Sequence, residues 1–242
     1  MVNVTKKNKI LVFSATYNES KNIKKLIIKI KNNLPNCDIL IIDDNSPDKT
    51  YEIIEHLKKK IKNINLIKRK SKLGLDTAHK TAYSFAIKNK YEKLITMDAD
   101  LSHDPSELKK FIRYLDKYQF VIGSRYMNGG KCLMPRKRLI LSKYGNLFIK
   151  LFLAINATEF TTSYRGFNLK KLNNFNVTNV SAKGYSFFMA VVIEIYKRKF
   201  SKKEIPITFR DRLHGKSKIP KFEILRTIIY LLIFRFKKIY EF

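Results

Sequence analysis

The sequence predicts an α/β domain in which a mostly parallel sheet is covered by helices on both faces. Short apolar runs alternate with longer segments of helical periodicity through the first half of the chain, as in βαβ units. Several of the apolar runs end in polar clusters. The 242 residues suit one large domain, and a hydrophobic content of 45% is enough to build its core.

Strands and helices are expected to alternate up to about residue 123. The expected strands are short runs rich in Ile, Leu and Val, at residues 10–15, 38–42, 65–68, 93–97 and 120–123. The expected helices carry apolar residues at three- and four-residue steps, at 20–34, 48–60, 75–89 and 105–117. In the first helix these residues fall on one face, which consists of Ile23, Leu26, Ile27, Ile30 and Leu34.

The second half of the chain is less regular. Residues 129–142 form a basic segment that is expected to be a loop, and apolar helices are expected at 144–155 and 185–199. A last helix is expected from Phe222 onward, with an apolar face made of Phe222, Leu225, Ile229, Leu232, Phe236 and Ile239. Lys and Arg residues flank that face, as they do in helices that lie in a membrane interface. No run reaches the roughly 18 apolar residues of a membrane span.

The net charge is strongly positive. Fifty Lys and Arg stand against 20 Asp and Glu, which gives a formal net charge of +30. Such a surface attracts polyanions, whether nucleic acid, anionic lipid headgroups or phosphorylated substrates. A composition rich in Lys, Asn and Ile is an equally good explanation for the scattered lysines. Because no recognisable nucleic-acid-binding motif accompanies the charge, no nucleic-acid partner is expected.

The most informative motif is Asp98-Ala99-Asp100. It follows the apolar run 93–97 and so stands at the carboxyl end of an expected buried strand. In open α/β sheets this is the edge where ligands bind. Two carboxylates at this spacing can hold a hard divalent cation, and such a cation can bind a diphosphate. A lone pair of this kind is more often a solvated turn, so the motif needs support from the rest of the chain.

Polar clusters follow three further strands. They are Thr16-Tyr17-Asn18-Glu19, Asp43-Asp44-Asn45-Ser46-Pro47-Asp48 and Gly123-Ser124-Arg125-Tyr126. Taken singly, Asn18, Asp48 and Asp104 are explained equally well as helix caps. Capping does not explain why four polar clusters should fall at the same edge of one sheet. The sequence therefore predicts a single site at that edge.

Taken in order, six motifs resemble the family 2 glycosyltransferases of the GT-A fold. More narrowly, they resemble the dolichyl-phosphate mannosyltransferases and their bacterial polyprenyl-phosphate relatives. The motifs are residues 16–19 (TYNE), 43–48 (DDNSPD), 98–103 (DADLSH), 123–126 (GSRY), 183–187 (KGYSF) and 212–218 (RLHGKSK). The resemblance implies a GT-A domain at 1–220, with a nucleotide-binding half at about 8–125 and an acceptor half at about 126–220. A helix at 221–242 would then dock on a membrane or a partner.

The resemblance implies a nucleotide-sugar site. The implied binding residues are Ala15, Tyr17, Glu19, Ile42, Asp43, Asp44, Asp98, Ala99, Asp100, Arg125, Arg212 and Lys218. Carboxylates suit guanine N–H groups and ribose hydroxyls, and arginine forks suit phosphate oxygens. The implied ligands of Mg²⁺ or Mn²⁺ are Asp98, Asp100 and Ser102. Asp98, Asp100 and Arg125 are the implied catalytic residues.

The resemblance also implies a lipid phosphate as the acceptor. Its second pKa is about 6, so it is largely an oxyanion at neutral pH and needs no general base. The implied phosphate ligands are Ser124 together with Arg136 and Arg138 of the basic segment 131–143. The expected reaction is metal-dependent, inverting transfer of mannose from GDP-mannose to a polyprenyl phosphate of the dolichyl type. One alternative is transfer from UDP-glucose or a UDP-amino sugar to undecaprenyl phosphate, and a remote one is a non-catalytic polyanion-binding protein.

Four positions depart from the family pattern. Ala15 stands where Pro is usual, and Ser102 stands where Gln commonly helps to hold the metal. Phe188 and Ala190 stand where relatives often carry Gln and Glu. A serine hydroxyl is a shorter and weaker ligand, so water or Asp104 would complete the metal's shell. These departures leave the donor sugar open. Ser102, Phe188 and Ala190 are the support for a degenerate, non-catalytic homologue as a further alternative.

The expected partners are a nucleotide sugar, a polyprenyl-phosphate lipid and a membrane surface. As the alternative to direct lipid docking, the helix at 221–242 would dock on a membrane-anchoring subunit. Cys37 and Cys132 form neither a disulfide framework nor a metal-binding spacing, which favours a reducing compartment. We therefore expect a cytoplasmic protein that is peripheral at the cytosolic face of a membrane.

Overall fold

The computed structural model describes residues 9–212, 214 and 223–237, and it confirms the predicted α/β fold class. Seven strands form one sheet in the order β3-β2-β1-β4-β7-β5-β8. They are β1 (Ile10–Thr16), β2 (Asp38–Asp43), β3 (Ile64–Lys68), β4 (Lys93–Thr96), β5 (Phe120–Ser124), β7 (Arg165–Asn168) and β8 (Lys202–Pro206). β7 runs antiparallel to β4 and β5, whereas the other neighbouring strands are parallel.

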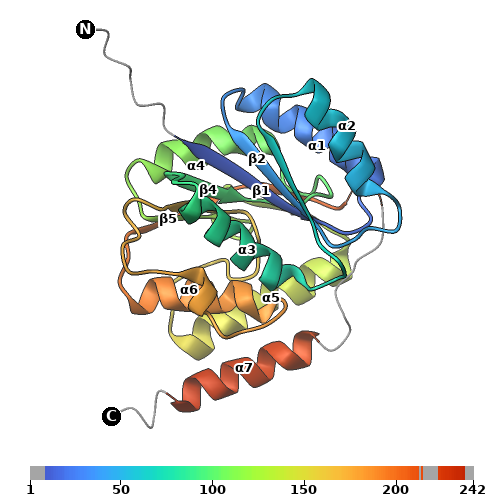
Figure 1. The fold of residues 1–242 in the computed structure, drawn as a ribbon. Coiled ribbons are helices and arrows are strands. Elements are labelled where there is room, and N and C mark those ends of the chain that lie inside the picture. The colour runs from blue at the N-terminus through green and yellow to red at the C-terminus, as the bar shows by residue number, and fades with distance from the viewer. Residues whose placement is uncertain (1–8, 213, 215–222, 238–242) are drawn as a thin grey trace, which may run out of the picture.

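Helices cover both faces of the sheet (Figure 1). One face is covered by α1 (Ser20–Asn33), α2 (Thr50–Lys60) and α4 (Leu108–Leu115), with the short 3-10 helix η1 (Pro105–Glu107) before α4. The other side carries α3 (Leu75–Lys88), α5 (Arg136–Leu153), the 3-10 helix η2 (Val177–Asn179), α6 (Ser186–Lys197) and α7 (Glu223–Lys237). α7 packs against α6 and α5 at the end of the molecule shown at the bottom of Figure 1.

The two-sided burial explains why the central strands are continuous apolar runs. Successive side chains of a strand point to opposite faces of the sheet. In β1, Val12 packs in the layer of α1, α2 and α4, whereas Leu11 and Phe13 pack in the layer of α3 and α6. All three side chains are fully buried. A parallel sheet covered on both faces therefore needs apolar residues at every position of its inner strands.

The expected loop at 129–142 is wrong in part. It contains β6 (Lys131–Leu133), which pairs with β9 (Thr208–Arg210) in a second, two-stranded sheet. It also contains the start of α5, which begins at Arg136 rather than 144. The first turn of α5 is strongly basic, an arrangement that the helix dipole disfavours, so the residues there carry no signal of a helix start.

Two strands of the main sheet have no strand-like sequence pattern. β7 is Arg-Gly-Phe-Asn and β8 is Lys-Lys-Glu-Ile-Pro, so neither shows an alternation of apolar and polar residues. Gly166 of β7 is required by packing, because a Cβ atom there would lie 2.8 Å from Cδ1 of Leu115 in α4. The close approach of α4 thus determines the residue at this position of β7.

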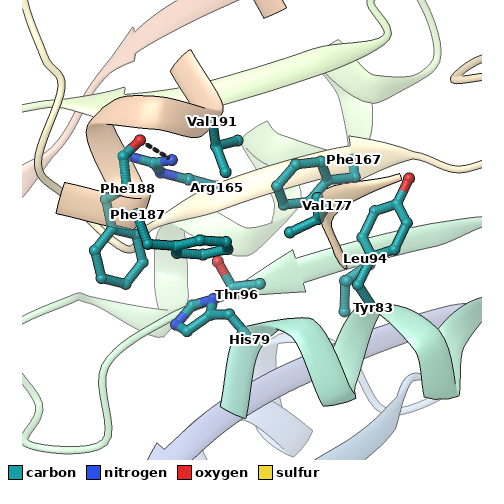
Figure 2. Close-up of a pocket in the computed structure, with 10 residues that line it drawn as sticks. All are labelled: His79, Tyr83, Leu94, Thr96, Arg165, Phe167, Val177, Phe187, Phe188 and Val191. Atoms are coloured by element: carbon teal, nitrogen blue, oxygen red, sulfur yellow. Dashed lines mark hydrogen bonds between the residues drawn. The ribbon is translucent and has the colours of Figure 1, made fainter. Parts of the chain in front are cut away.

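A small cavity lies between α3, β4, β7 and α6, and Figure 2 shows Arg165 beside it. The guanidinium of Arg165 is buried and donates hydrogen bonds to the carbonyls of Thr162, Phe160 and Phe188, at 2.7, 2.8 and 2.6 Å. Burial lowers the pKa of Arg165 to about 9. These bonds tie the loop before β7 to the start of α6. Phe188, one of the positions that depart from the family pattern, therefore lies in the core.

Acid sensitivity of the fold is expected from His79 on α3. Its ring packs edge-on against Phe13 and Phe188, and burial lowers its pKa to about 3. In the unfolded chain His79 takes up a proton near pH 6.5, whereas in the folded chain it stays neutral until the pH approaches 3. Its contribution to the unfolding free energy is therefore complete above pH 6.5 and is lost as the pH falls toward 3. The share due to His79 should be about 2 kcal/mol between pH 7 and pH 5.

Urea unfolding at pH 7 and pH 5 tests this expectation. The variant His79→Leu should lose roughly that share of the pH dependence. His56→Gln is the matched control, because His56 lies exposed on α2, and it should keep the wild-type dependence. An unchanged pH dependence in His79→Leu would show that this histidine is not the acid-sensitive group.

Candidate active site

The four polar clusters lie at one edge of the sheet. β2, β1 and β4 are adjacent and parallel, and Thr16 at the end of β1 is in register with Asp43 at the end of β2. β5 points the same way but is separated from β4 by the antiparallel strand β7. The loop that leads into β7 therefore enters the site between the ends of β4 and β5, a placement that the sequence did not predict.

Asp98 and Asp100 are held in a tight turn after β4. The backbone N–H of Asp98 donates to Nδ1 of His103 at 3.0 Å, and the Asp98 carboxylate accepts a hydrogen bond from the Ser163 hydroxyl. The Asp100 carboxylate accepts from the backbone N–H of Ser102 at 3.1 Å. Between them, Leu101 has φ 65°, in the left-handed region. This turn, residues 98–103, is here called the carboxylate turn. It fixes both carboxylates before any ligand binds.

Arg212 lies beside Asp100. Its Nη1 is 3.7 Å from Oδ2 of Asp100, and both side chains are largely buried. The preceding residue, Asp211, accepts a hydrogen bond from Arg138 at 2.9 Å. A short charged segment thus joins the first turn of α5 to the carboxylate pair.

His103 is a buried support for the carboxylate turn. Its Nδ1 accepts from Asp98, so in the neutral ring Nε2 carries the proton and donates to Oγ1 of Thr162 at 3.1 Å. Burial lowers the pKa of His103, with the charges of Asp98 and Asp100 opposing the shift. A neutral imidazole in this position links the turn after β4 to the loop before β7.

Arg125, at the end of β5, forms a buried ion pair with Glu159. Its Nε and Nη2 donate to the two carboxylate oxygens at 2.7 and 2.8 Å, and Nη2 also donates to Thr161. Burial acts to raise the pKa of Glu159, but the Arg125 charge and hydrogen bonds from Arg125 and Thr161 hold the pKa below its usual range. The Arg125 guanidinium already donates hydrogen bonds to Glu159 and Thr161. Its contact with a diphosphate remains a prediction.

Hydrogen bonds run continuously from the end of β5 to the carboxylate turn. Arg125 bonds to Glu159, Glu159 accepts from the backbone N–H of Thr162 at 3.2 Å, and Thr162 bonds to His103, which holds Asp98. Buried polar networks in which each member is paired are rigid. The loop between α5 and β7 is therefore the part of the fold that orients the ends of β4 and β5.

This loop was not predicted from the sequence. Glu159 is the single acidic residue between Asp116 and Glu194, so a lone carboxylate in a basic stretch was the available signal. Thr162 and Ser163 offered no such signal, because hydroxyl residues are common in turns.

The predicted nucleotide-binding residues lie at the ends of β1 and β2. Asp43 is fully buried and accepts hydrogen bonds from the hydroxyls of Thr16 and Ser46, at 2.8 and 2.6 Å. Asp44 forms an ion pair with Arg69 at 3.0 Å. Burial raises the pKa of Asp44, and Arg69 opposes the shift. Asp43 therefore braces the turn after β2, whereas the buried Asp44 links that turn to Arg69, the residue after β3.

Further predicted nucleotide ligands surround the same corner. Glu19 accepts a hydrogen bond from Asn22 at 2.7 Å, and the ammonium of Lys72 lies 4.4 Å from the centre of the Tyr17 ring. Ala15 is partly buried. Ile42 is fully buried in the core, so any contact of Ile42 with a nucleotide is made by its backbone. The nucleotide roles of these residues remain predictions.

The carboxylate turn fits a divalent cation that binds together with a diphosphate. No group of three His, Cys, Asp or Glu residues suited to a metal occurs in the described part of the chain. Mg²⁺ is usually held by one or two carboxylates together with substrate phosphates and water, and Asp98 and Asp100 supply such a pair. The Ser102 hydroxyl is buried without a hydrogen-bond partner, so its oxygen has capacity for a further ligand.

The predicted acceptor-phosphate residues lie in two places. Arg136 and Arg138 stand in the first turn of α5, where Arg138 pairs with Asp211. Ser124 is fully buried, shares a hydrogen bond with Thr158 at 2.7 Å and accepts from two backbone N–H groups, so it braces the turn after β5. Lys218, a predicted phosphate contact, lies outside the described residues.

The order of the sheet and the carboxylate pair after its central strand define the GT-A class of nucleotide-sugar transferases. The chain belongs to glycosyl transferase family 2, whose family model matches residues 11–175. It is 33% identical over 212 residues to a polyprenol monophosphomannose synthase from Mycolicibacterium smegmatis, covering 86% of this chain and 80% of that protein. The protein is accordingly a glycosyltransferase.

A second relative agrees with this assignment, and a solved structure shares the fold. The chain is 29% identical to an undecaprenyl-phosphate mannosyltransferase from Micrococcus luteus, over 87% of each sequence. Its fold matches a mannosyltransferase from Pyrobaculum calidifontis, solved in complex with GDP-Man and Mn²⁺, with a TM-score of 0.61 and 17% identity. That match covers 97% of this chain and 64% of the solved chain.

Proposed function

We propose that the protein transfers mannose from GDP-mannose to a polyprenyl phosphate, giving a mannosyl phosphate lipid. The observation that carries the proposal is the carboxylate turn, in which Asp98 and Asp100 are fixed at the end of β4 with Arg212 beside Asp100. The two relatives named for mannose transfer to prenyl phosphates support the choice of sugar and acceptor. A glycosyltransferase complex with GDP-Man supports the choice of donor.

The chain's own residues would bind the donor and hold its diphosphate. Tyr17, Glu19 and Asp44 would line the pocket for the base and ribose, and Arg212 would pair with diphosphate oxygens. A bound Mg²⁺ or Mn²⁺ at Asp98 and Asp100 would neutralise charge on the leaving nucleoside diphosphate. Manganese in a related structure supports a divalent cation and does not separate it from magnesium.

The acceptor phosphate would act as the nucleophile without a protein base. Its oxygen forms a bond to the anomeric carbon as the bond from that carbon to the diphosphate oxygen breaks, and GDP leaves. No proton has to move, because the phosphate is already largely ionised at neutral pH. Arg136 and Arg138 would hold this phosphate opposite the diphosphate and offset the repulsion between the two anions. A displacement of this kind inverts the anomeric configuration.

A donor and acceptor panel tests the proposal. The protein is incubated with Mg²⁺ or Mn²⁺, with GDP-mannose, UDP-glucose or a UDP-amino sugar, and with dolichyl or undecaprenyl phosphate. Transfer is expected from GDP-mannose and to require the metal. Transfer from a UDP sugar alone would favour the undecaprenyl-phosphate glycosyltransferase alternative, and an anomeric assignment showing retention would contradict the displacement.

The lipid acceptor implies that the protein works at a membrane. In the described part of the chain, no helix is long and apolar enough to span a bilayer. We place the protein at the cytosolic face as a peripheral protein, with residues 221–242 in contact with lipid or with a membrane-anchoring subunit. Of the predicted apolar face of this helix, Ile229 and Leu232 have described side chains, and both are exposed.

A further inference from the structure

α5 presents a continuous apolar face to the outside of the molecule. Its exposed side chains include six large hydrophobic ones, here called the α5 ridge: Ile140, Leu141, Tyr144, Leu147, Phe148 and Leu151. At 100° per residue they fall within an arc of about 120°. Tyr144 is 63% exposed and Leu151 is 70% exposed. The opposite side of α5, with Asn146, Ile149 and Leu153, is buried against the domain.

The α5 ridge belongs to a larger concentration of exposed apolar side chains. α7 exposes Ile228, Ile229, Leu232 and Ile233, while Leu231 on its other side is buried in the helical layer that contains α6 and α5. Together, the two helices carry ten of the 14 large hydrophobic side chains that are exposed in the described residues. Single exposed apolar residues are normal, whereas a cluster of this kind marks an interaction surface. Figure 1 shows α5 and α7 at the same end of the molecule.

The charge around the α5 ridge favours anionic lipid as its partner. α5 contains five basic residues and no acidic one: Arg136, Lys137, Arg138, Lys143 and Lys150. On α7, Arg226 and Arg235 are exposed beside the apolar face. An apolar face flanked by Lys and Arg matches the boundary between acyl chains and anionic headgroups. Because α5 carries no acidic residue, its positive charge complements an anionic surface better than a purely apolar one.

The position of α5 connects the ridge to the active site. α5 begins at Arg136, and its first turn holds the ion pair of Arg138 with Asp211, next in sequence to the Arg212 that pairs with Asp100. The 18 residues of α5 extend about 27 Å from that point. A lipid whose tail stays in the bilayer can thus present its phosphate at the start of the same helix.

We propose that the α5 ridge is a membrane-contact surface that seats the enzyme on an anionic bilayer, with α7 beside it. α5 lies along the headgroup region with its ridge toward the acyl chains. Its basic first turn then faces the headgroups from which the acceptor phosphate is taken. Only this last step rests on the proposed function, because lipid contact by the ridge does not depend on which sugar is transferred.

Vesicle sedimentation tests the contact. The wild-type chain is expected to bind phosphatidylglycerol-containing vesicles and to bind phosphatidylcholine vesicles more weakly. The double variant Phe148→Glu, Leu151→Glu should lower affinity for the anionic vesicles by about tenfold or more. The matched control, Ile28→Glu with Ile87→Glu, adds the same charge at exposed apolar positions on α1 and α3 and should bind like the wild type. Equal thermal unfolding of both variants excludes misfolding as the cause.

A fluorescence measurement locates the contact directly, because the chain contains no Trp. The single substitution Tyr144→Trp should give an emission that shifts to the blue on adding anionic vesicles and is quenched by brominated lipid. Ile87→Trp should show neither effect. If the wild-type protein did not bind anionic vesicles, the proposal would be overturned in favour of a protein partner on this face. Vesicle binding that leaves the emission of the Tyr144→Trp variant unchanged would overturn it in favour of another lipid-contacting surface.

Activity on a short, water-soluble prenyl phosphate separates the two proposals. The double variant Phe148→Glu, Leu151→Glu, here called the ridge variant, should transfer sugar to this acceptor at the wild-type rate. It should lose activity on a long-chain acceptor in vesicles. If the wild type transfers to neither acceptor but still binds vesicles through the α5 ridge, the proposed function fails and the membrane contact stands. If the ridge variant keeps full activity and full vesicle binding, the membrane contact fails and the proposed function stands.

Discussion

Replacing Asp100 by Asn is expected to lower the transfer rate by about a hundred- to a thousandfold, the typical loss for one preorganised electrostatic group. The carboxylate of Asp100 faces both the Arg212 guanidinium and the proposed cation position, so its charge serves two partners. Asn keeps the size and the hydrogen bond from the Ser102 backbone N–H but removes that charge. Initial rates at saturating donor, with matched thermal unfolding curves, measure the effect.

The matched control for this variant is Asp38→Asn. Asp38 stands at the start of β2, at the opposite end of that strand from the site, where its carboxylate accepts a hydrogen bond from Tyr91. This control should keep a rate close to the wild type. If Asp100→Asn also kept that rate, the carboxylate turn would not be the diphosphate site.

Replacing Glu159 by Gln is expected to destabilise the protein by about 3–5 kcal/mol, because it leaves the buried Arg125 charge without a counter-charge. The pair is almost completely inaccessible to solvent, so water cannot take the place of the carboxylate. Urea titration measures the unfolding free energy of the variant and of the wild type. Both curves are fitted with the same dependence of that free energy on urea concentration, and the two values are subtracted.

Glu194→Gln is the control, since Glu194 near the end of α6 pairs with Arg198 just after it, and both side chains are partly exposed. Exposed pairs contribute about 0–1 kcal/mol, so this variant should unfold nearly like the wild type. A loss of less than about 1 kcal/mol in Glu159→Gln would mean that the ion pair does not hold the loop between α5 and β7.

The first half of the fold follows from sequence pattern because it is built from regular βαβ units. Strands such as β1 and β2 are apolar on both faces, and α1 shows a clean apolar stripe, so each element is visible locally. The same regularity places the turn of Asp98 and Asp100 at the carboxyl edge of the sheet. These features are local, and local patterns are what a single sequence records.

The second half does not follow in the same way, because its elements are defined by distant partners. β7 forms a strand because it pairs with β4 on one side and β5 on the other, and Gly166 leaves room for the side chain of Leu115 in α4. Nothing in its own four residues indicates a strand. α5 is exposed over its apolar ridge, so its hydrophobic residues do not report a buried face. The role of Glu159 depends on Arg125, 34 residues earlier in the chain, and pairings of that kind have no local signature.

Mass spectrometry of the lipid extract, after incubation of the protein with GDP-mannose, a divalent cation and polyprenyl phosphate, tests the proposed transfer most directly. The expected product is a lipid whose mass exceeds that of the acceptor by one anhydrohexose unit, formed by the wild type and almost absent with Asp100→Asn. An unchanged lipid, with GDP-mannose left intact or merely hydrolysed, would contradict the proposed transfer.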